Sequence, residues 1–292
     1  MEHQNYKQMQ DLDVNSRDNY VQQVLELLGR DYEPKRQANE LSGPPLFRHR
    51  ESRIDFTLIP RGEFQMGLSE QEESAARRIL DPPPFDSSGM RPAATRKMRS
   101  FLLSTSPMMV GQAQRLFGDS GLSRYLNPST VTKAEPNPYA PVYINRETAI
   151  SMAESLGCRL PYEAEWEYSC RGNTTSLFPW GDALPPDREL ERWLDFGLPP
   201  DRWNRNGFGL YQLFSGDWCV DGWTDSHEEG ATACEGVFVI KGGGAIFWPW
   251  QNSGEWIWCM PARRMPSSGL TGDRTCAFRL VKELAGGREN DR

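Results

Sequence analysis

The sequence predicts a loop-rich α+β fold. Short runs with the alternation of strands and short runs with the spacing of helices follow one another along the chain, and no run of either kind is long. The 292 residues include 26 glycines and 22 prolines, which interrupt these runs so often that loops must form much of the fold. A chain of this length can still bury a sizeable core.

Residues 1–45 are expected to form a polar N-terminal arm with one amphipathic helix. The apolar positions of this helix have helical spacing, and Gly29 follows them as a residue that favours helix ends. These positions are Val21, Val24, Leu25 and Leu28. We expect a docking helix on a weakly ordered arm, then one domain over residues 46–284 and a frayed tail over residues 285–292.

The domain is expected to begin with two strands separated by a Pro-Arg-Gly turn. The first covers Ile54–Ile59, and the alternation of Phe64 and Met66 marks the second. A polar and then proline-rich segment over residues 69–95 predicts an irregular surface excursion. Further strands are expected over residues 101–109, 141–144, 206–214, 237–244 and 276–281, and further helices over residues 110–117, 146–156 and 187–198.

The stretch RLPYEAEWEYSCRG, Arg159–Gly172, predicts a short helix around which the chain is organised. Glu163 and Glu165 lie in its first turn, where the helix dipole favours negative charge, and Gly172 suits a left-handed end. These acids and Glu167 could act in acid–base chemistry, but pairing with nearby arginines explains them more simply. One face is expected to be buried, and it carries Tyr162, Trp166 and Cys170.

Composition narrows the classes of partner and cofactor. The net charge is −7 with both signs interspersed, which gives no reason to expect a nucleic acid or an anionic membrane as partner. No apolar run reaches the roughly 18 residues that a membrane-spanning helix needs, so we expect a cytoplasmic protein. The sequence has three scattered histidines and no CxxC motif, so zinc and non-haem iron are not expected.

A tryptophan-rich segment near the C-terminus is the candidate ligand-binding region. Trp248 and Trp250 form one pair at i, i+2, and Trp256 and Trp258 form another, so within strands each pair would point to one face. Such rings could line a binding groove or could pack irregular loops. The polar groups of such a groove would come from Gln251, Glu255, Arg263 and Arg264.

Six motifs in one order resemble the formylglycine-generating enzyme, or sulfatase-modifying factor, family. They are IPRGEFQMG, PVYINRETAISMAESLGCRLPYEAEWEYSCRG, FPWGD, NGFGLYQLF, KGGG and FRLV. The resemblance covers Ile54 to Val281 and implies a C-type-lectin-like α+β fold that is poor in regular structure.

The resemblance also implies chemistry that this chain is expected to lack. Aerobic family members oxidise a substrate cysteine with a pair of copper(I)-binding cysteines after the KGG element. The matching positions here lie near Phe247, where the sequence has no thiol, so copper is not expected. The family pattern further implies that Cys170 and Cys259 lie close, either as a disulfide or as packed thiols. At one family calcium site, Asp217 and Asp221 could supply oxygen ligands in this chain.

The leading functional hypothesis is a recognition module that binds a polypeptide or a small ligand in the tryptophan-lined groove. One alternative is a divergent oxidoreductase with other residues, for instance Cys219 with Cys234. A second is a scaffold or regulatory subunit that docks through its N-terminal helix. The sequence leaves the ligand and the oligomeric state open.

Overall fold

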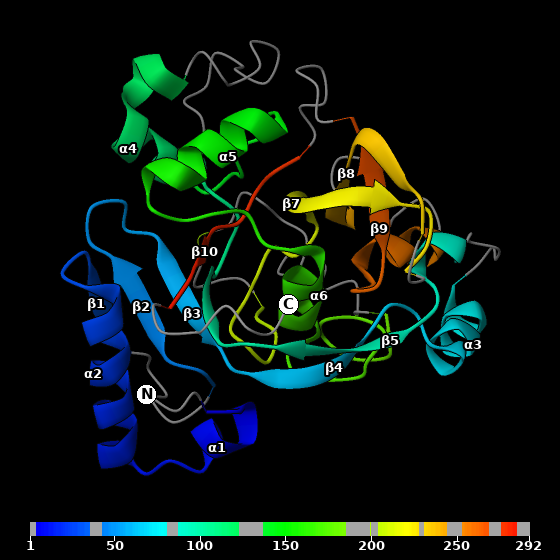
Figure 1. The fold of residues 1–292 in the computed structure, drawn as a ribbon, viewed down its shortest axis with the longest axis horizontal. Helices are drawn as coiled ribbons and strands as arrows, with labels where there is room; N and C mark the ends of the chain where they lie inside the picture. Colours follow the sequence, from blue (N-terminus) through cyan, green and yellow to red (C-terminus); the bar gives the residue numbers. More distant parts are fainter. Residues whose placement is uncertain are drawn as a thin grey trace.

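The computed structural model describes residues 4–35, 43–80, 87–122, 137–184, 199, 204–227, 231–243, 253–268 and 276–284. A five-stranded antiparallel sheet with the order β1-β2-β3-β6-β10 forms one side of the molecule (Figure 1). Its strands are Tyr32–Lys35, Leu46–His49, Asp55–Ile59, Phe101–Ser104 and Val281–Lys282. The last strand comes from the end of the described chain, so the sheet joins distant parts of the sequence.

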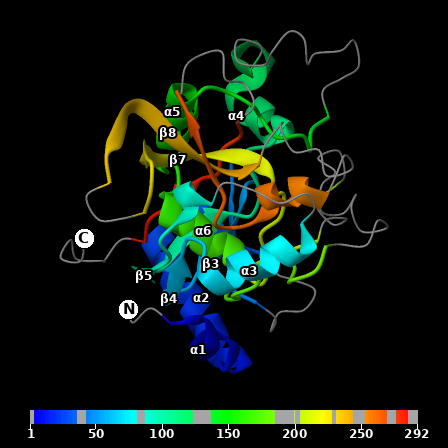
Figure 2. The ribbon, with the colours of Figure 1, turned by 90° about the vertical axis from the view of Figure 1, so that its right-hand side faces the viewer.

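Two smaller antiparallel sheets complete the strand framework. β4 and β5 pair as one ribbon, and β7, β8 and β9 form a three-stranded sheet. Their bounds are Gly62–Met66, Ala94–Met98, Ser215–Thr224, Ala233–Gly243 and Arg264–Ser267. Figure 2 shows the β7–β8 hairpin standing above the layer that contains α6 and α3.

The helices lie around these sheets, with α6 in the centre of Figure 1. Their bounds are α1 Tyr6–Gln10, α2 Val14–Leu28, α3 Glu70–Ile79, α4 Val110–Leu122, α5 Arg146–Ser155 and α6 Glu163–Arg171, with 3-10 turns η1 Ser88–Met90 and η4 Ser253–Cys259. The expected cap of α5 is confirmed, because Asn145 accepts the Thr148 N–H at 2.8 Å. None of the helices in the described ranges is both long and apolar enough to span a membrane.

The buried apolar side chains form two main clusters. The first combines α2, α5 and the large sheet, with Val24, Phe56 and Leu102 fully buried. The second surrounds α6 and includes Trp166 and Phe178 together with η4. The central helix is therefore the element that the second core packs around, as its sequence predicts.

The N-terminal segment differs from the expected weakly ordered arm. β1 pairs with β2 at the edge of the large sheet, and the apolar face of α2 packs into the first core cluster. Gly29 ends α2 as predicted, with a left-handed φ of 77°. The apolar positions of α2 therefore pack against its own domain.

Several local predictions are corrected by the structure. The excursion over 69–95 contains α3, which begins at the reciprocal capping box of Ser69 and Glu72, and the first residues of β5. Residues 206–214 are turns rather than a strand, and only Val281–Lys282 forms a regular strand in the last predicted segment.

Tyr162 caps α6 and is 42% exposed, so it does not share the buried face of Trp166 and Cys170. The helix expected over 187–198 lies outside the described residues.

Candidate functional site

Helix α6 carries three glutamates that are all buried and all paired. Glu165 makes a bidentate contact with Arg159, with both N···O distances at 2.7 Å. Glu167 binds Arg171 at 2.9 Å and Lys241 of β8 at 3.0 Å. Both carboxylates are therefore paired with basic side chains of the fold.

The third glutamate, Glu163, lies in a cluster of basic side chains at the start of α6. Its Oε1 is 3.0 Å from Arg264 Nε, 3.5 Å from Lys241 Nζ and 3.5 Å from His227 Nε2. Burial opposes ionisation of this carboxyl, but Lys241, His227 and Arg264 outweigh it and lower the pKa of Glu163 to about 2. The ionised cluster joins α6 to β8 and β9.

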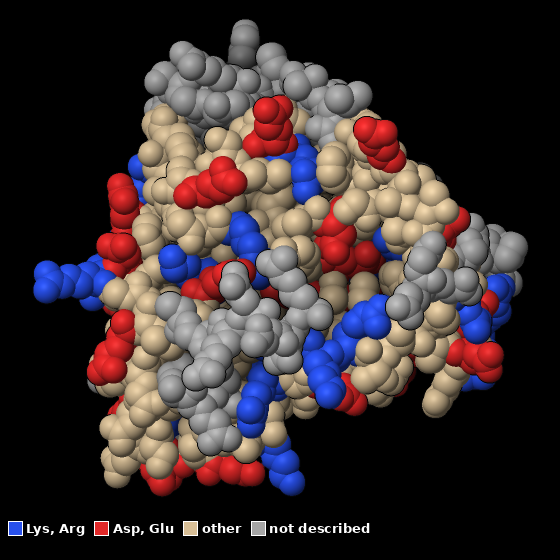
Figure 3. Space-filling view, viewed as in Figure 1, with Lys and Arg blue, Asp and Glu red and all other residues tan. Residues whose placement is uncertain are grey.

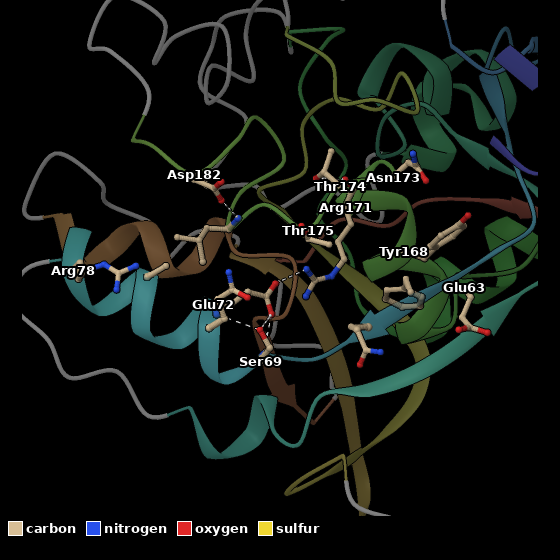
Figure 4. A pocket seen from close by; sticks show the side chains of 15 residues that line it. Glu63, Ser69, Glu72, Arg78, Tyr168, Arg171, Asn173, Thr174, Thr175 and Asp182 are labelled. Atoms are coloured by element: carbon tan, nitrogen blue, oxygen red, sulfur yellow. Dashed lines mark hydrogen bonds and ion pairs between the residues drawn. The ribbon is translucent and has the colours of Figure 1, made fainter. Parts of the chain in front are cut away.

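The C-terminal end of α6, which carries Arg171, borders a pocket of about 690 Å³ between α6 and α3. Arg171 donates to Glu72 of α3 at 2.6 Å, and Figure 4 shows this pair in the middle of the pocket. The walls also come from β4 and the loop after α6. The lining residues are Glu63, Phe64, Gln65, Ser69, Gln71, Glu72, Ala75, Arg78, Tyr168, Arg171, Asn173, Thr174, Thr175, Leu177 and Asp182.

This pocket was not predicted from the sequence. It depends on α3, which was not predicted, although Ser69 and Glu72 have the spacing of a capping box. Gln71, Ala75 and Arg78 recur at helical spacing on one face of α3 and line the pocket together. Figure 3 shows acidic and basic side chains interspersed on one face of the molecule.

The predicted tryptophan groove lies only partly within the described residues. Trp248, Trp250, Gln251 and the side chain of Glu255 lie outside them. Trp256 is 5% exposed and packs edge-on against Trp180 at 5.6 Å, so it belongs to the core rather than to a groove. Trp256 and Trp258 lie in the 3-10 turn η4, which corrects their predicted strand geometry.

The two arginines of the predicted groove have different environments. Arg264 is buried, pairs with Glu163 and stacks on Trp223 at 4.4 Å, which corrects its expected role as a groove residue. Arg263 stacks on the half-buried Trp258 at 4.3 Å. In the described chain, Trp258 and Arg263 are therefore the groove candidates that remain near the surface.

The two carboxylates predicted to bind calcium, Asp217 and Asp221, are engaged by other groups of the protein. Asp217 Oδ2 accepts both Trp166 Nε1 and Arg279 Nε at 2.8 Å, and the Asp217–Arg279 pair is fully buried. Asp221 accepts the Glu163 backbone N–H at 2.5 Å. Both carboxylates thus bind the protein itself. Within the described ranges, no group of three or more His, Cys, Asp or Glu side chains is arranged to hold a metal ion.

All six cysteines belong to the described part of the chain. Cys234 is exposed, and the other five are buried. Burial raises the pKa of Cys158 to about 11 and raises the pKa values of Cys170, Cys219 and Cys259 as well. Thiols that stay protonated and buried are poor nucleophiles and poor copper ligands.

Of the two predicted cysteine pairs, one lies together in the core and the other is separated along a hairpin. Cys170 and Cys259 share the second core cluster without a disulfide, and Cys170 is close enough to contribute, after burial, to the raised pKa of Cys259. Cys219 and Cys234 are far apart on the β7–β8 hairpin, because Trp218 faces Ile240 whereas Thr224 faces Ala233. The proposed redox pair of Cys219 and Cys234 is therefore wrong.

The sequence is similar to those of known formylglycine-generating enzymes. The formylglycine-generating enzyme of Mycobacterium tuberculosis is 30% identical over 176 residues, covering 48% of this chain and 56% of that enzyme. The Mus musculus formylglycine-generating enzyme is 34% identical over 104 residues, covering 30% of this chain and 28% of that enzyme. The chain thus matches between 28% and 56% of the length of these relatives.

Solved structures show the same fold at low sequence identity. PvdO from Pseudomonas aeruginosa superposes with a TM-score of 0.61 and 18% identity, covering 83% of this chain and 99% of that structure. Treponema denticola variable protein 1 superposes with a TM-score of 0.53 and 15% identity, covering 87% and 100%. The Sulfatase-modifying factor enzyme 1-like domain matches residues 45–284, and the chain belongs to this family of formylglycine-generating-enzyme-like proteins.

Proposed function

We propose that this domain is a recognition module that binds a polypeptide or a small ligand and lacks the family's cysteine-oxidase chemistry. The supporting observation is the state of its thiols. Copper(I) needs accessible thiolates held close together. Here the three cysteines of the second core cluster, Cys170, Cys219 and Cys259, are buried with raised pKa values, and the exposed Cys234 lies elsewhere.

The pocket between α3 and α6 is the binding site that the described residues favour. Its volume of about 690 Å³ lies within the range of small-ligand sites, roughly 300 to 1,000 Å³. Its walls combine apolar rings with hydroxyl, amide and charged groups, which suits a polar ligand. Trp258 and Arg263 remain candidates for a second part of the binding surface, and a cytoplasmic location remains a prediction.

A competition titration with a chelator of known copper(I) affinity tests the proposed loss of thiol chemistry. We expect the chelator to retain the copper at equimolar protein, and we expect Cys234→Ser to leave the result unchanged. Tight binding of one copper(I) ion that is lost in Cys170→Ser or Cys259→Ser would contradict the proposal. Circular dichroism of each variant establishes that it is folded.

A further inference from the structure

We propose that the pocket between α3 and α6 binds a dipolar peptide segment, with a ligand carboxylate at Arg78 and a ligand cation at Glu63. This inference rests on the proposed recognition function and names the ligand class of the same pocket. Figure 4 shows Arg78 and Glu63 at opposite ends of the pocket, with Glu72 and Arg171 between them.

Arg78 supplies a guanidinium that the described residues leave available. Its side chain is exposed on the last turn of α3, and no acidic residue of the described chain forms an ion pair with it. Among the described residues, the acid nearest to Arg78 in sequence is Glu73, which already binds Arg77 at 2.6 Å and Arg91 at 2.5 Å. Because a guanidinium can hold a carboxylate through two parallel hydrogen bonds, Arg78 suits an acidic ligand group.

Glu63 supplies the opposite charge on β4. It is exposed and faces Lys97 across the β4–β5 ladder, but within the described chain no ion pair forms between them or with any other basic residue. Its carboxylate can therefore accept hydrogen bonds from a ligand ammonium or guanidinium. The pocket thus presents one cation and one anion at its two ends.

The middle of the pocket contains a neutralised ion pair and one further carboxylate. Glu72 and Arg171 neutralise each other at 2.6 Å, whereas Asp182 accepts the Leu177 N–H at 2.9 Å and keeps its negative charge. Between these groups the walls offer the rings of Phe64 and Tyr168. A ligand whose centre is uncharged and whose ends are oppositely charged matches this pattern.

The size of the pocket favours a few residues of extended chain. Glu72 and Arg78 are six positions apart on α3, which corresponds to about 9 Å along the helix axis. Because Glu72 lies between Arg78 and Glu63, the two charged groups are farther apart than this. An extended peptide advances roughly 3.3 Å per residue, so the ligand needs at least four residues, with its long cationic side chain reaching toward Glu63.

Fluorescence anisotropy with four labelled tetrapeptides tests the inference on the full chain. The peptides are blocked at both termini and carry Asp and Lys, two Asp, two Lys, or Asn and Gln at their ends, with two alanines between. We expect the Asp/Lys peptide to bind at least about fivefold more tightly than the others, since each matched charge pair adds affinity. Arg78→Glu should shift the preference to the peptide with two Lys, and Glu63→Lys to the peptide with two Asp.

Arg77→Glu is the matched control, because Arg77 is adjacent to Arg78 but does not line the pocket. It should keep the preference for the Asp/Lys peptide, and thermal unfolding checks that every variant is folded. Equal binding of the four peptides, absence of binding, or preferences that ignore Arg78→Glu and Glu63→Lys would each overturn the inference. Such a result leaves the copper titration unaffected, so the two failures are distinguishable.

Discussion

Arg171 donates from Nη1 to Oε1 of Glu72 at 2.6 Å, and this contact joins helix α6 to helix α3. The same guanidinium also bonds Glu167 within α6 and the carbonyl of Gly67 at 2.8 Å. One arginine, 5% exposed, therefore fixes both sides of the pocket. Arg171 and Glu72 are therefore held in position at the pocket before a ligand binds.

Replacing Arg171 should destabilise the domain strongly. Arg171→Met leaves buried Glu167 without one of its cations, and breaking a buried pair costs about 3 to 5 kcal/mol of unfolding free energy. Arg77→Met is the control, since Arg77 forms a half-exposed pair with Glu73 whose loss should cost less than about 1 kcal/mol. Urea unfolding measures both, and equal losses would argue against the arrangement around Arg171.

Acidification should weaken the cluster around Glu163. The pKa of this carboxyl is about 2 in the folded protein, below its ordinary value of 4.5, so the unfolded chain binds the proton first. The stabilisation is therefore complete above about pH 5 and is lost as the pH falls through the folded pKa. In Glu163→Gln, stability should fall less between pH 5 and pH 2 than in the unchanged protein. Identical pH slopes in urea unfolding would count against this role of Glu163.

Gly242 should be intolerant of a side chain. Its φ is +86°, and a Cβ there would lie 2.4 Å from the Leu213 carbonyl oxygen and 2.9 Å from the indole of Trp166. Gly242→Ala should cost about 2 to 4 kcal/mol, because overpacking adds to backbone strain. Gly209→Ala isolates the strain, since Gly209 has φ +79° and no atom within 4 Å of a built Cβ. Thermal unfolding should rank Gly242→Ala as clearly the less stable; the reverse order would refute the packing described here.

Native alkylation should modify one thiol per chain. Cys234 is exposed, whereas Cys170 and Cys259 are buried and have raised pKa values, so iodoacetamide should label Cys234 first. Mass spectrometry of the folded protein should show one adduct, and Cys234→Ser should show none on the same time scale. Rapid labelling of two thiols would contradict the burial described here.

The ends of helices could be predicted from the sequence, because neighbouring residues determine them. The negative first turn of α6 and Gly172 predicted the central helix, and Asn145 predicted the cap of α5. The order of the six motifs also indicated the family.

Long-range pairing could not be predicted in the same way. Glu163 and Arg264 are 101 positions apart in sequence, and only the folded chain brings them within 3.0 Å. The same holds for Asp217 and Arg279, whose contact removes an expected calcium ligand. The miss at α3 was different, because its capping pattern was local and was hidden by the polar composition around it.

Oxygen consumption in the presence of copper(I) and a thiol-containing peptide measures whether the family scaffold is retained here without its thiol chemistry. The full chain should consume oxygen no faster than its Cys170→Ser and Cys259→Ser variants. Peptide-dependent oxygen consumption that either variant abolishes, while remaining folded, would contradict it.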